Sequence, residues 1–187
     1  PTVSFKFHPY FGKHDLLDKL PRRLKAYRRW IPAHYRIVVL VDTDQEDCIK
    51  LKNRLEQHAH NASFPTKSGA GRSQFIVLNR LAIEELEAWF FGDFEALVRA
   101  YPRLDPNIAN RKPYKEPDAI RGGTWEALER VLKQAGYYRG GLAKITLARE
   151  VSAYMVPERN RSRSFQVFRE GLLALAGQTY SKSNGSN

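Results

Sequence analysis

Three aspartates, Asp42, Asp44 and Asp47, directly follow the apolar run Ile-Val-Val-Leu-Val at positions 37–41. A β-branched run of this length is typical of a buried parallel strand, and open α/β sheets bind their ligands at the carboxyl ends of such strands. Crowded carboxylates are ligands for a hard divalent cation such as Mg²⁺ or Mn²⁺, which neutralises phosphate charge and activates water. The spacing therefore predicts a metal site for phosphoryl transfer. A polar turn in which Asp47 caps the next helix is the alternative.

The same pattern recurs where Glu84, Glu85 and Glu87 follow the apolar run at positions 75–83. Glu84 and Glu87 are three residues apart and can share a helix face, and Glu85 is a further candidate. Acids are also favourable at any helix N-terminus because they complement the helix dipole, so a purely structural role stays open. Two acidic strand ends in one parallel sheet converge at the same edge, which favours a joint metal site.

Two basic segments are candidates for phosphate binding. Arg139 and Lys144 flank a pair of glycines, which would let the backbone approach a phosphate while the two cations supply charge. The segment lacks the spacing and the final Ser or Thr of a Walker A loop, and a simple turn between helices is the alternative. Further along the chain, Arg161 and Arg163 could hold phosphates, and Ser164 is a candidate helix cap.

The charge balance points to a polyanionic partner. Lysine and arginine total 31 against 20 aspartates and glutamates, which gives a net charge of +11. Basic residues concentrate at positions 13–36 and 130–169, whereas acids concentrate at 42–56 and 84–95. Such a chain most often binds nucleic acid, and an acidic centre between basic blocks suits a metal site within a phosphate-binding surface. A generally basic protein without such a partner is the plainer alternative.

Cysteine usage and hydropathy narrow the class of protein. Cys48 is the single cysteine, which excludes an internal disulfide framework and a cysteine-based zinc site. No apolar stretch approaches the roughly 20 residues needed to span a bilayer, and no secretory signal is visible at the start of the chain. We therefore predict a cytoplasmic protein that does not associate with membranes.

Hydrophobic periodicity predicts an α/β fold in which a parallel sheet is flanked by helices and followed by a helical C-terminal extension. Pro21 predicts a kink or a division into two helices, and Thr124 is a candidate N-cap. The predicted strands cover positions 3–8, 36–41 and 75–83. The predicted helices cover positions 13–30, 46–60, 84–101, 125–135, 142–155 and 164–175. The predicted domains are an α/β core at 1–102, a helical part packed on it at 103–176 and a disordered tail at 177–187.

Four segments, in this order, resemble the DUF4276 family, whose fold is related to the Toprim domain. They are Val-Leu-Val-Asp-Thr-Asp at 39–44, Ile-Glu-Glu-Leu-Glu-Ala-Trp-Phe at 83–90, Tyr-Arg-Gly-Gly-Leu-Ala-Lys at 138–144 and Asn-Arg-Ser-Arg-Ser-Phe at 160–165. The resemblance covers positions 5–175. It implies a Toprim-like sheet with Asp42 and Asp44 as Mg²⁺ ligands, and Glu84, Glu85 or Glu87 as the later acidic motif of the related nucleases. It also implies a bacterial antiphage-defence or mobile-element context, often with an ATPase partner.

The chain departs from the family pattern at its start. Toprim domains carry a glutamate at the end of their first strand, which serves as metal ligand or general acid/base. Positions 3–8 match the second strand of the pattern, and we find no match to the first strand, its glutamate or the following helix. On this interpretation Pro1 could follow a removed initiator Met, or the chain could be a fragment. A missing strand would expose sheet edges or apolar surface, which favours a partner or a homodimer.

The leading hypothesis is a Mg²⁺- or Mn²⁺-dependent nuclease that cleaves phosphodiester bonds of DNA or RNA. A non-catalytic nucleic-acid-binding or ATPase-associated subunit is the alternative, and a small-molecule phosphotransferase or phosphatase is a third class that the basic blocks disfavour. The predicted catalytic residues are Asp42, Asp44, Glu84 and Glu85. The predicted metal ligands are Asp42, Asp44, Asp47, Glu84 and Glu87. The predicted phosphate-binding residues are Arg139, Lys144, Arg161 and Arg163.

Overall fold

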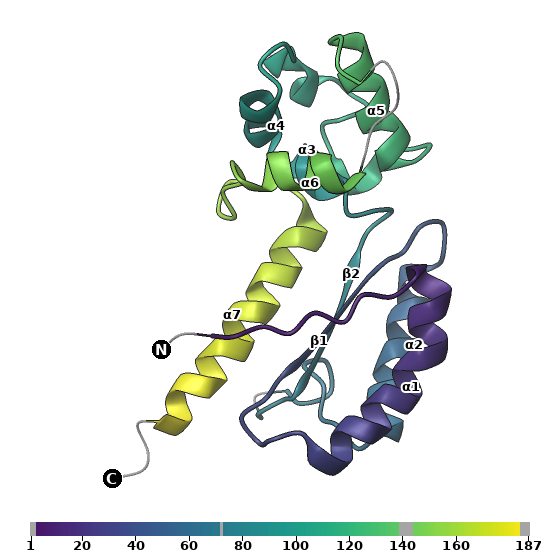
Figure 1. Ribbon diagram of the computed structural model, residues 1–187, viewed down its shortest axis with the longest axis vertical. Helices are drawn as coiled ribbons and strands as arrows, with labels where there is room; N and C mark the ends of the chain where they lie inside the picture. The colour runs from purple at the N-terminus through teal and green to yellow at the C-terminus, as the bar shows by residue number, and fades with distance from the viewer. Residues whose placement is uncertain (1–2, 72, 139–143, 184–187) are drawn as a thin grey trace.

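The computed structural model describes residues 3–71, 73–138 and 144–183, with side chains to residue 177. Its sheet consists of two parallel strands, β1 (Ile37–Asp42) and β2 (Val77–Ala82), paired so that Ile37 lies opposite Val77 and Asp42 opposite Ala82. Helices flank this sheet on both sides (Figure 1). The predicted α/β fold with a parallel sheet flanked by helices is therefore confirmed. Its relationship to the Toprim domain stays a prediction.

The alternation of side chains along β1 places the two faces of the sheet against different helices. Val39 and Val41 are buried in a cluster with leucines of α1 (Gly12–Trp30) and α2 (Cys48–Asn61). Leu40 instead packs in a cluster with Phe168 of α7 (Arg163–Ser183). This follows from the two-residue period of a strand, which turns successive side chains to opposite faces. α1 and α2 thus cover one face, and α7 lies along the other (Figure 1).

A second core holds together the helices beyond the carboxyl end of the sheet. The elements are α3 (Ala88–Gly92), α4 (Phe94–Ala100), α5 (Thr124–Gln134), α6 (Lys144–Ser152) and two short 3₁₀ helices, η1 (Pro106–Asn110) and η2 (Pro117–Ala119). Phe91 and Leu97 share this buried core with Leu128, Leu132 and Leu147. α3 and α4, which lie in the core predicted at 1–102, thus pack with α5 and α6. The division of the chain into domains stays a prediction.

Residues 3–8 do not form the predicted strand. They are exposed and lie outside any strand. Among the described residues, none of their backbone groups hydrogen-bonds to a neighbouring strand. The alternating pattern was present, but a strand also needs a neighbour to pair with. In α1, by contrast, Pro21 lies inside one helix without dividing it. Burial of Leu17, Leu20 and Leu24 on the sheet side outweighs the local cost of the proline.

The single helix predicted at positions 84–101 is wrong. A turn follows β2, and two short helices, α3 and α4, replace it. Glu84 takes a positive φ of 59°, a conformation that an α-helix cannot include. Asp93 then ends α3 and caps α4 through a hydrogen bond from the amide of Ala96. Asp93 is a residue type that favours caps over helix interiors, whereas the turn at Glu84 is held by a hydrogen bond from its amide to Thr43 Oγ1.

The C-terminal helix differs from its prediction at both ends. Ser162, rather than Ser164, caps α7, because its Oγ accepts a hydrogen bond of 3.1 Å from the amide of Phe165. α7 continues to Ser183 and so includes most of the segment 177–187 that the sequence predicts to be a disordered tail. In the described part of the chain, no helix combines the length and apolar character that crossing a membrane requires.

The close approach of α7 to β2 requires a glycine at position 171. A Cβ atom there would lie 2.8 Å from Leu78 Cδ1 and 2.9 Å from Arg80 Nη2. We expect Gly171→Ala to destabilise the fold by about 1–3 kcal/mol, since overpacking outweighs the better helix propensity of alanine. Gly177→Ala is the matched control, because a Cβ there meets nothing within 4 Å. Urea unfolding of both variants measures the difference, and equal effects at the two positions would contradict the expectation.

Candidate functional site

The segments that follow β1 and β2 are joined to each other at the carboxyl edge of the sheet. The amide of Asp44 donates a hydrogen bond of 2.7 Å to the carbonyl of Glu84, and the amide of Glu84 donates one of 2.8 Å to Thr43 Oγ1. Asp44 (φ 48°) and Glu84 (φ 59°) both adopt the left-handed conformation that this pairing needs. The two acidic segments, which lie 40 residues apart in the chain, are therefore neighbours in space.

Asp42 is the most perturbed acid of this edge. It is half-buried at the end of β1, and burial raises its pKa from 3.8 to about 6, with the negative charges of Glu87, Asp44 and Glu85 adding to the rise. Burial also raises the pKa of Glu87, although the nearby Lys144 opposes the rise. Asp42, Glu85 and Glu87 thus form a partly desolvated group of like charges, which we call the carboxylate group.

Lys144 is the counter-ion of the carboxylate group. Its Nζ lies 3.6 Å from Glu85 Oε1 and 3.7 Å from Glu87 Oε1, and it sits 4.5 Å from the ring centroid of Trp125. About half of the Lys144 side chain is exposed (51%). The sequence singles out Lys144 as a phosphate-binding residue, but its neighbours in space are these acids and the face of Trp125. Nothing in the sequence points to Trp125.

Glu85 accepts hydrogen bonds from the start of α5 in addition to its ion pair with Lys144. Its Oε2 accepts hydrogen bonds from the amide of Trp125 at 2.7 Å and from Thr124 Oγ1 at 3.1 Å. It therefore caps α5, which begins at Thr124 after Gly123, and the predicted N-cap role of Thr124 is wrong. The first amides of a helix have no hydrogen-bond partner within the helix, and a carboxylate from a distant segment can supply one. One oxygen of Glu85 is thus committed to α5, and the other faces Lys144.

A second lysine neutralises the segment after β1. Lys13 Nζ lies 2.9 Å from Asp44 Oδ2 and 3.4 Å from Glu46 Oε2, and it donates a hydrogen bond of 2.8 Å to the carbonyl of Thr43. Sequence reasoning missed Lys13, because it lies at the start of α1 with no spacing relation to the aspartates. Asp47, a predicted metal ligand, caps α2 through bonds from two backbone amides, which lower its pKa.

The predicted phosphate-binding residues Arg161 and Arg163 have partners other than the carboxylate group. Arg161 donates from its backbone to the carbonyl of Gly92, and its guanidinium contacts the carbonyl of Ala109. Arg163 is exposed and pairs with Glu170 on the next turns of α7. Arg139 lies outside the described residues. Among the described residues, Lys144 is thus the predicted phosphate-binding residue that lies beside the carboxylate group.

The polar residues between the two arginines are structural. Ser162 Oγ donates a hydrogen bond of 2.7 Å to Asp118 Oδ1, and the amide of Ser164 donates one of 2.7 Å to Asp118 Oδ2. Asn160 is buried and donates to the carbonyl of Trp89 at 2.8 Å. The segment therefore joins the start of α7 to α3 and η2, which holds the second core against the sheet.

A family model described as "Domain of unknown function (DUF4276)" matches residues 3–173 of the chain. The chain belongs to the DUF4276 family. Membership covers β1, β2, the carboxylate group and Lys144, so the family resemblance seen in the sequence is confirmed. No curated protein and no solved structure matched the chain. The Toprim relationship and the missing first strand remain predictions for this DUF4276 protein.

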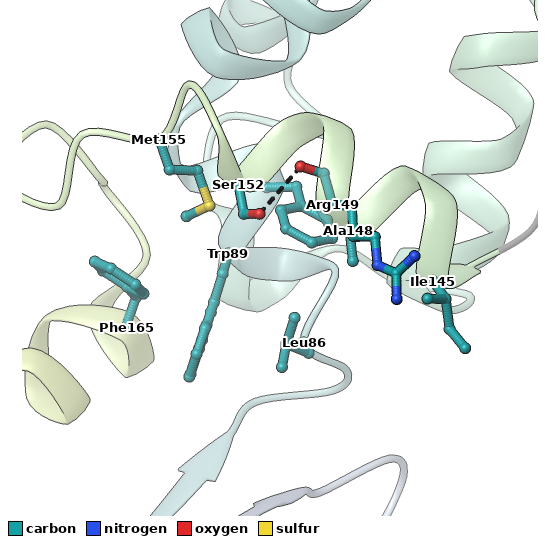
Figure 2. Close-up of a pocket in the computed structure, with 9 residues that line it drawn as sticks. Leu86, Trp89, Ile145, Ala148, Arg149, Ser152, Met155 and Phe165 are labelled. Atoms are coloured by element: carbon teal, nitrogen blue, oxygen red, sulfur yellow. Dashed lines mark hydrogen bonds between the residues drawn. The ribbon is translucent and has the colours of Figure 1, made fainter. Parts of the chain in front are cut away.

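This DUF4276 chain has an apolar hollow of about 410 Å³, whose lining includes sequence neighbours of the carboxylate group and of Lys144. Figure 2 shows its walls, which come from α3, α6 and the start of α7. Leu86, which separates Glu85 from Glu87, and Ile145, which follows Lys144, both line it. Trp89 and Phe165 form the opposite part of the lining, with Trp89 held by a hydrogen bond to Ser164.

The donor chemistry of the carboxylate group suits a divalent cation, although its present geometry does not form a closed site. Carboxylate oxygens are the preferred ligands of Mg²⁺ and Mn²⁺, and mutual repulsion at Asp42 is relieved by any cation placed there. Within the described residues, however, no three His, Cys, Asp or Glu side chains converge on one point. Lys144 and Lys13 supply the positive charge in this arrangement.

The raised pKa of Asp42 predicts a pH-dependent effect of Asp42→Asn on stability. The Asp42 carboxyl ionises near 3.8 in an unfolded chain and near 6 in the fold, so the stability that its protonated form contributes is complete below pH 3.8 and lost as pH rises through 6. Asparagine resembles the protonated form. We expect the variant to match the wild type in acid and to be about 1–3 kcal/mol more stable at neutral pH. Urea unfolding across this pH range tests it, and a difference that does not change with pH would contradict it.

Proposed function

We propose that this protein is a Mg²⁺- or Mn²⁺-dependent nuclease that cleaves phosphodiester bonds of DNA or RNA. The observation that carries the proposal is the carboxylate group at the ends of two adjacent parallel strands, in which burial, with the like charges of the neighbouring acids added to it, raises the pKa of Asp42 to about 6. A chain of net charge +11 has little reason to gather repelling, partly buried acids at its sheet edge unless a cation joins them. The same chain charge favours a polyanionic substrate.

Each residue of the site has a definite part in this proposal. Asp42, Asp44 and Glu87 would hold the ion, which supplies charge neutralisation at a phosphate and lowers the pKa of water. Glu85 keeps the start of α5 in place and leaves one oxygen toward the site. Lys144 is half-exposed and held by long ion pairs, so it can exchange its contact with the acids for a substrate phosphate. The backbone of Glu84 keeps the two strand ends together.

The apolar hollow supports a nucleotide substrate. Its lining includes Leu86, which lies between Glu85 and Glu87 in the sequence, and Ile145, which follows Lys144. A sugar or base attached to a phosphate at Lys144 could pack there, since bases pack on apolar and aromatic side chains. The bacterial defence or mobile-element context, the ATPase partner and the cytoplasmic location expected from the sequence belong to the same proposal.

One observation favours a second candidate function, a non-catalytic nucleic-acid-binding or ATPase-associated subunit. Lys144 and Lys13 already neutralise the acids at both strand ends. If these ion pairs persist when nucleic acid binds, the edge would be a structural element of a basic binding protein. Such a protein binds nucleic acid with strong salt dependence but without turnover and without a metal requirement.

The deciding experiment is a cleavage assay with plasmid DNA, single-stranded DNA and RNA, each with Mg²⁺, Mn²⁺ or a chelator. The proposed nuclease cleaves at least one substrate with a metal ion and none with the chelator. Binding measured in parallel, at several salt concentrations, separates the two candidates. Binding without cleavage under every metal condition would replace the nuclease by the binding subunit.

A further inference from the structure

Another pocket lies at the amino end of the sheet, opposite to the carboxylate group. Its volume is about 380 Å³, within the roughly 300–1,000 Å³ of ligand-binding clefts. The end of α1, the turn from α1 to β1 and the residues at 64–65 and 74–76 line it. Figure 1 shows the strands starting at the end of the sheet away from the helices of the second core. Six-residue strands put roughly 17 Å between the two ends, so this pocket is separate from the proposed nuclease site.

The charged residues that line this pocket are both arginines, so we call it the arginine pocket. Arg28 belongs to the last turn of α1, and Arg36 directly precedes β1. No aspartate or glutamate is among the described residues of the lining. The guanidinium carbon of Arg28 lies 5.8 Å from the ring centroid of Phe64, so the face of an aromatic ring holds this cation. Two cations without an acid favour an anionic ligand.

The guanidinium of Arg36 is held in place but is only partly supplied with acceptors. Its Nη1 donates hydrogen bonds to the carbonyls of Ala33 at 2.9 Å and of Tyr35 at 2.8 Å, which fixes the group in the turn. Its Nε is buried and has no hydrogen-bond partner among the described residues. Burial lowers the pKa of Arg36, as expected where no acid offsets the desolvation of the charge. One edge of the guanidinium thus lacks an acceptor, and such an edge binds phosphate through two parallel hydrogen bonds.

The rest of the lining is mainly apolar. Tyr35 lines the pocket and is 49% exposed, although it is a large aromatic residue. Ile31 and Pro32 line it from the same turn, and Pro65 lines it from the segment after α2. Exposed aromatic rings beside cations are the usual surface on which proteins stack nucleobases. An apolar wall next to two arginines therefore fits a ligand that combines a phosphate with a flat ring.

We propose that the arginine pocket binds a nucleoside 5′-monophosphate group, either as a free nucleotide or as the 5′-phosphate end of a nucleic-acid strand. The phosphate meets Arg28 and the free edge of Arg36, and the base packs on Tyr35. A terminal phosphate is favoured over the phosphodiester groups inside a strand, because a phosphate monoester carries about −1.5 to −2 charges at neutral pH and so matches two arginines. This site does not depend on the proposed nuclease activity.

Isothermal titration calorimetry of the full 187-residue chain, with a chelator present, tests the proposal. Adenosine 5′-monophosphate should bind saturably, inorganic phosphate more weakly, and adenosine, which lacks the phosphate, not measurably. Arg28→Gln and Arg36→Gln should each weaken binding of the nucleotide about 10–100-fold, the usual effect of losing a hydrogen bond to a charged group. Arg22→Gln is the matched control, because Arg22 is exposed on α1 and does not line the pocket. It should bind the nucleotide as the wild type does.

Two results would overturn the proposal. One is the absence of saturable binding when the wild type meets the nucleotide at millimolar concentration, and the other is wild-type affinity in both pocket variants. Arg36→Gln also removes the hydrogen bonds to the turn, so urea unfolding first establishes that this variant folds. Arg28→Gln and Tyr35→Ala alter exposed side chains and keep the test decisive in any case. Tyr35→Ala should weaken binding about 10-fold through the loss of base stacking.

A pair of single-stranded oligonucleotides, identical except for a 5′-phosphate or a 5′-hydroxyl, distinguishes the two sources of the ligand. Tighter binding of the phosphorylated strand, lost in Arg28→Gln, assigns the pocket to the end of a nucleic-acid strand. Equal binding of both strands, together with binding of adenosine 5′-monophosphate, assigns it to a free nucleotide.

Discussion

Replacing Asp42 and Asp44 together by asparagine is expected to reduce metal-dependent cleavage by at least about 100-fold, because loss of residues that only support a metal ligand already costs 10–100-fold. Asparagine has nearly the same shape but lacks the charge that would hold the ion. The fold should persist, since neutralising Asp42 removes both the cost of burying its charge and the repulsion from neighbouring acids, which together raise its pKa. Cleavage of the substrate found for the wild type, at fixed Mg²⁺ or Mn²⁺, measures the effect.

Asp18→Asn is the matched control for this change. Asp18 lies on the exposed side of α1, so the same loss of charge there should leave cleavage close to the wild-type rate. A second measurement does not depend on activity. Mg²⁺ or Mn²⁺ should raise the unfolding temperature of the wild type, because a ligand that binds the folded state stabilises it, and should not raise that of the double variant. Undiminished cleavage by the double variant would refute the proposed metal site.

Asp93→Ala is expected to destabilise the protein by about 3–5 kcal/mol, the usual cost of removing one partner from a buried ion pair. The Asp93 side chain is fully buried (0% exposed). It accepts hydrogen bonds from Arg159 Nε and from the amide of Val156, both at 2.7 Å, and it caps α4 through Ala96. The variant leaves buried donors without an acceptor, in the region that joins α3 and α4 to the loop before α7. Urea unfolding gives the change in free energy.

Glu95→Ala provides the comparison, because Glu95 also pairs with Arg159, at 2.6 Å, but is 48% exposed. Solvent screens such a pair, so its loss should cost less than about 1 kcal/mol. If the two variants lose the same stability, burial is not what makes the Asp93 bonds important. Asp93 carries no sequence signature beyond a cap, and its partners Val156 and Arg159 lie more than 60 residues away.

The parts of the fold that could be predicted are those whose signal is local. The continuous apolar runs gave β1 and β2 nearly to the residue, since buried parallel strands need apolar side chains on both faces. The helix after β1 was equally clear from its period and its Asp47 cap. The helix predicted at 84–101 failed because the left-handed turn at Glu84 is imposed by Thr43, a residue of the other strand.

For the candidate site, the sequence alone determined which acids stand at the strand ends, that Lys144 is a cation of interest, and that a basic chain surrounds them. Only the tertiary structure decided how these residues are used. In the fold, Glu85 accepts a hydrogen bond from the start of α5, Asp47 caps α2, and Lys13 forms an ion pair with Asp44. The position of a strand, and so the identity of the residues at its end, can be recognised from the residue types within a short stretch of sequence. Ion pairs and caps between distant segments depend on how helices pack against the sheet, and no local spacing encodes that packing.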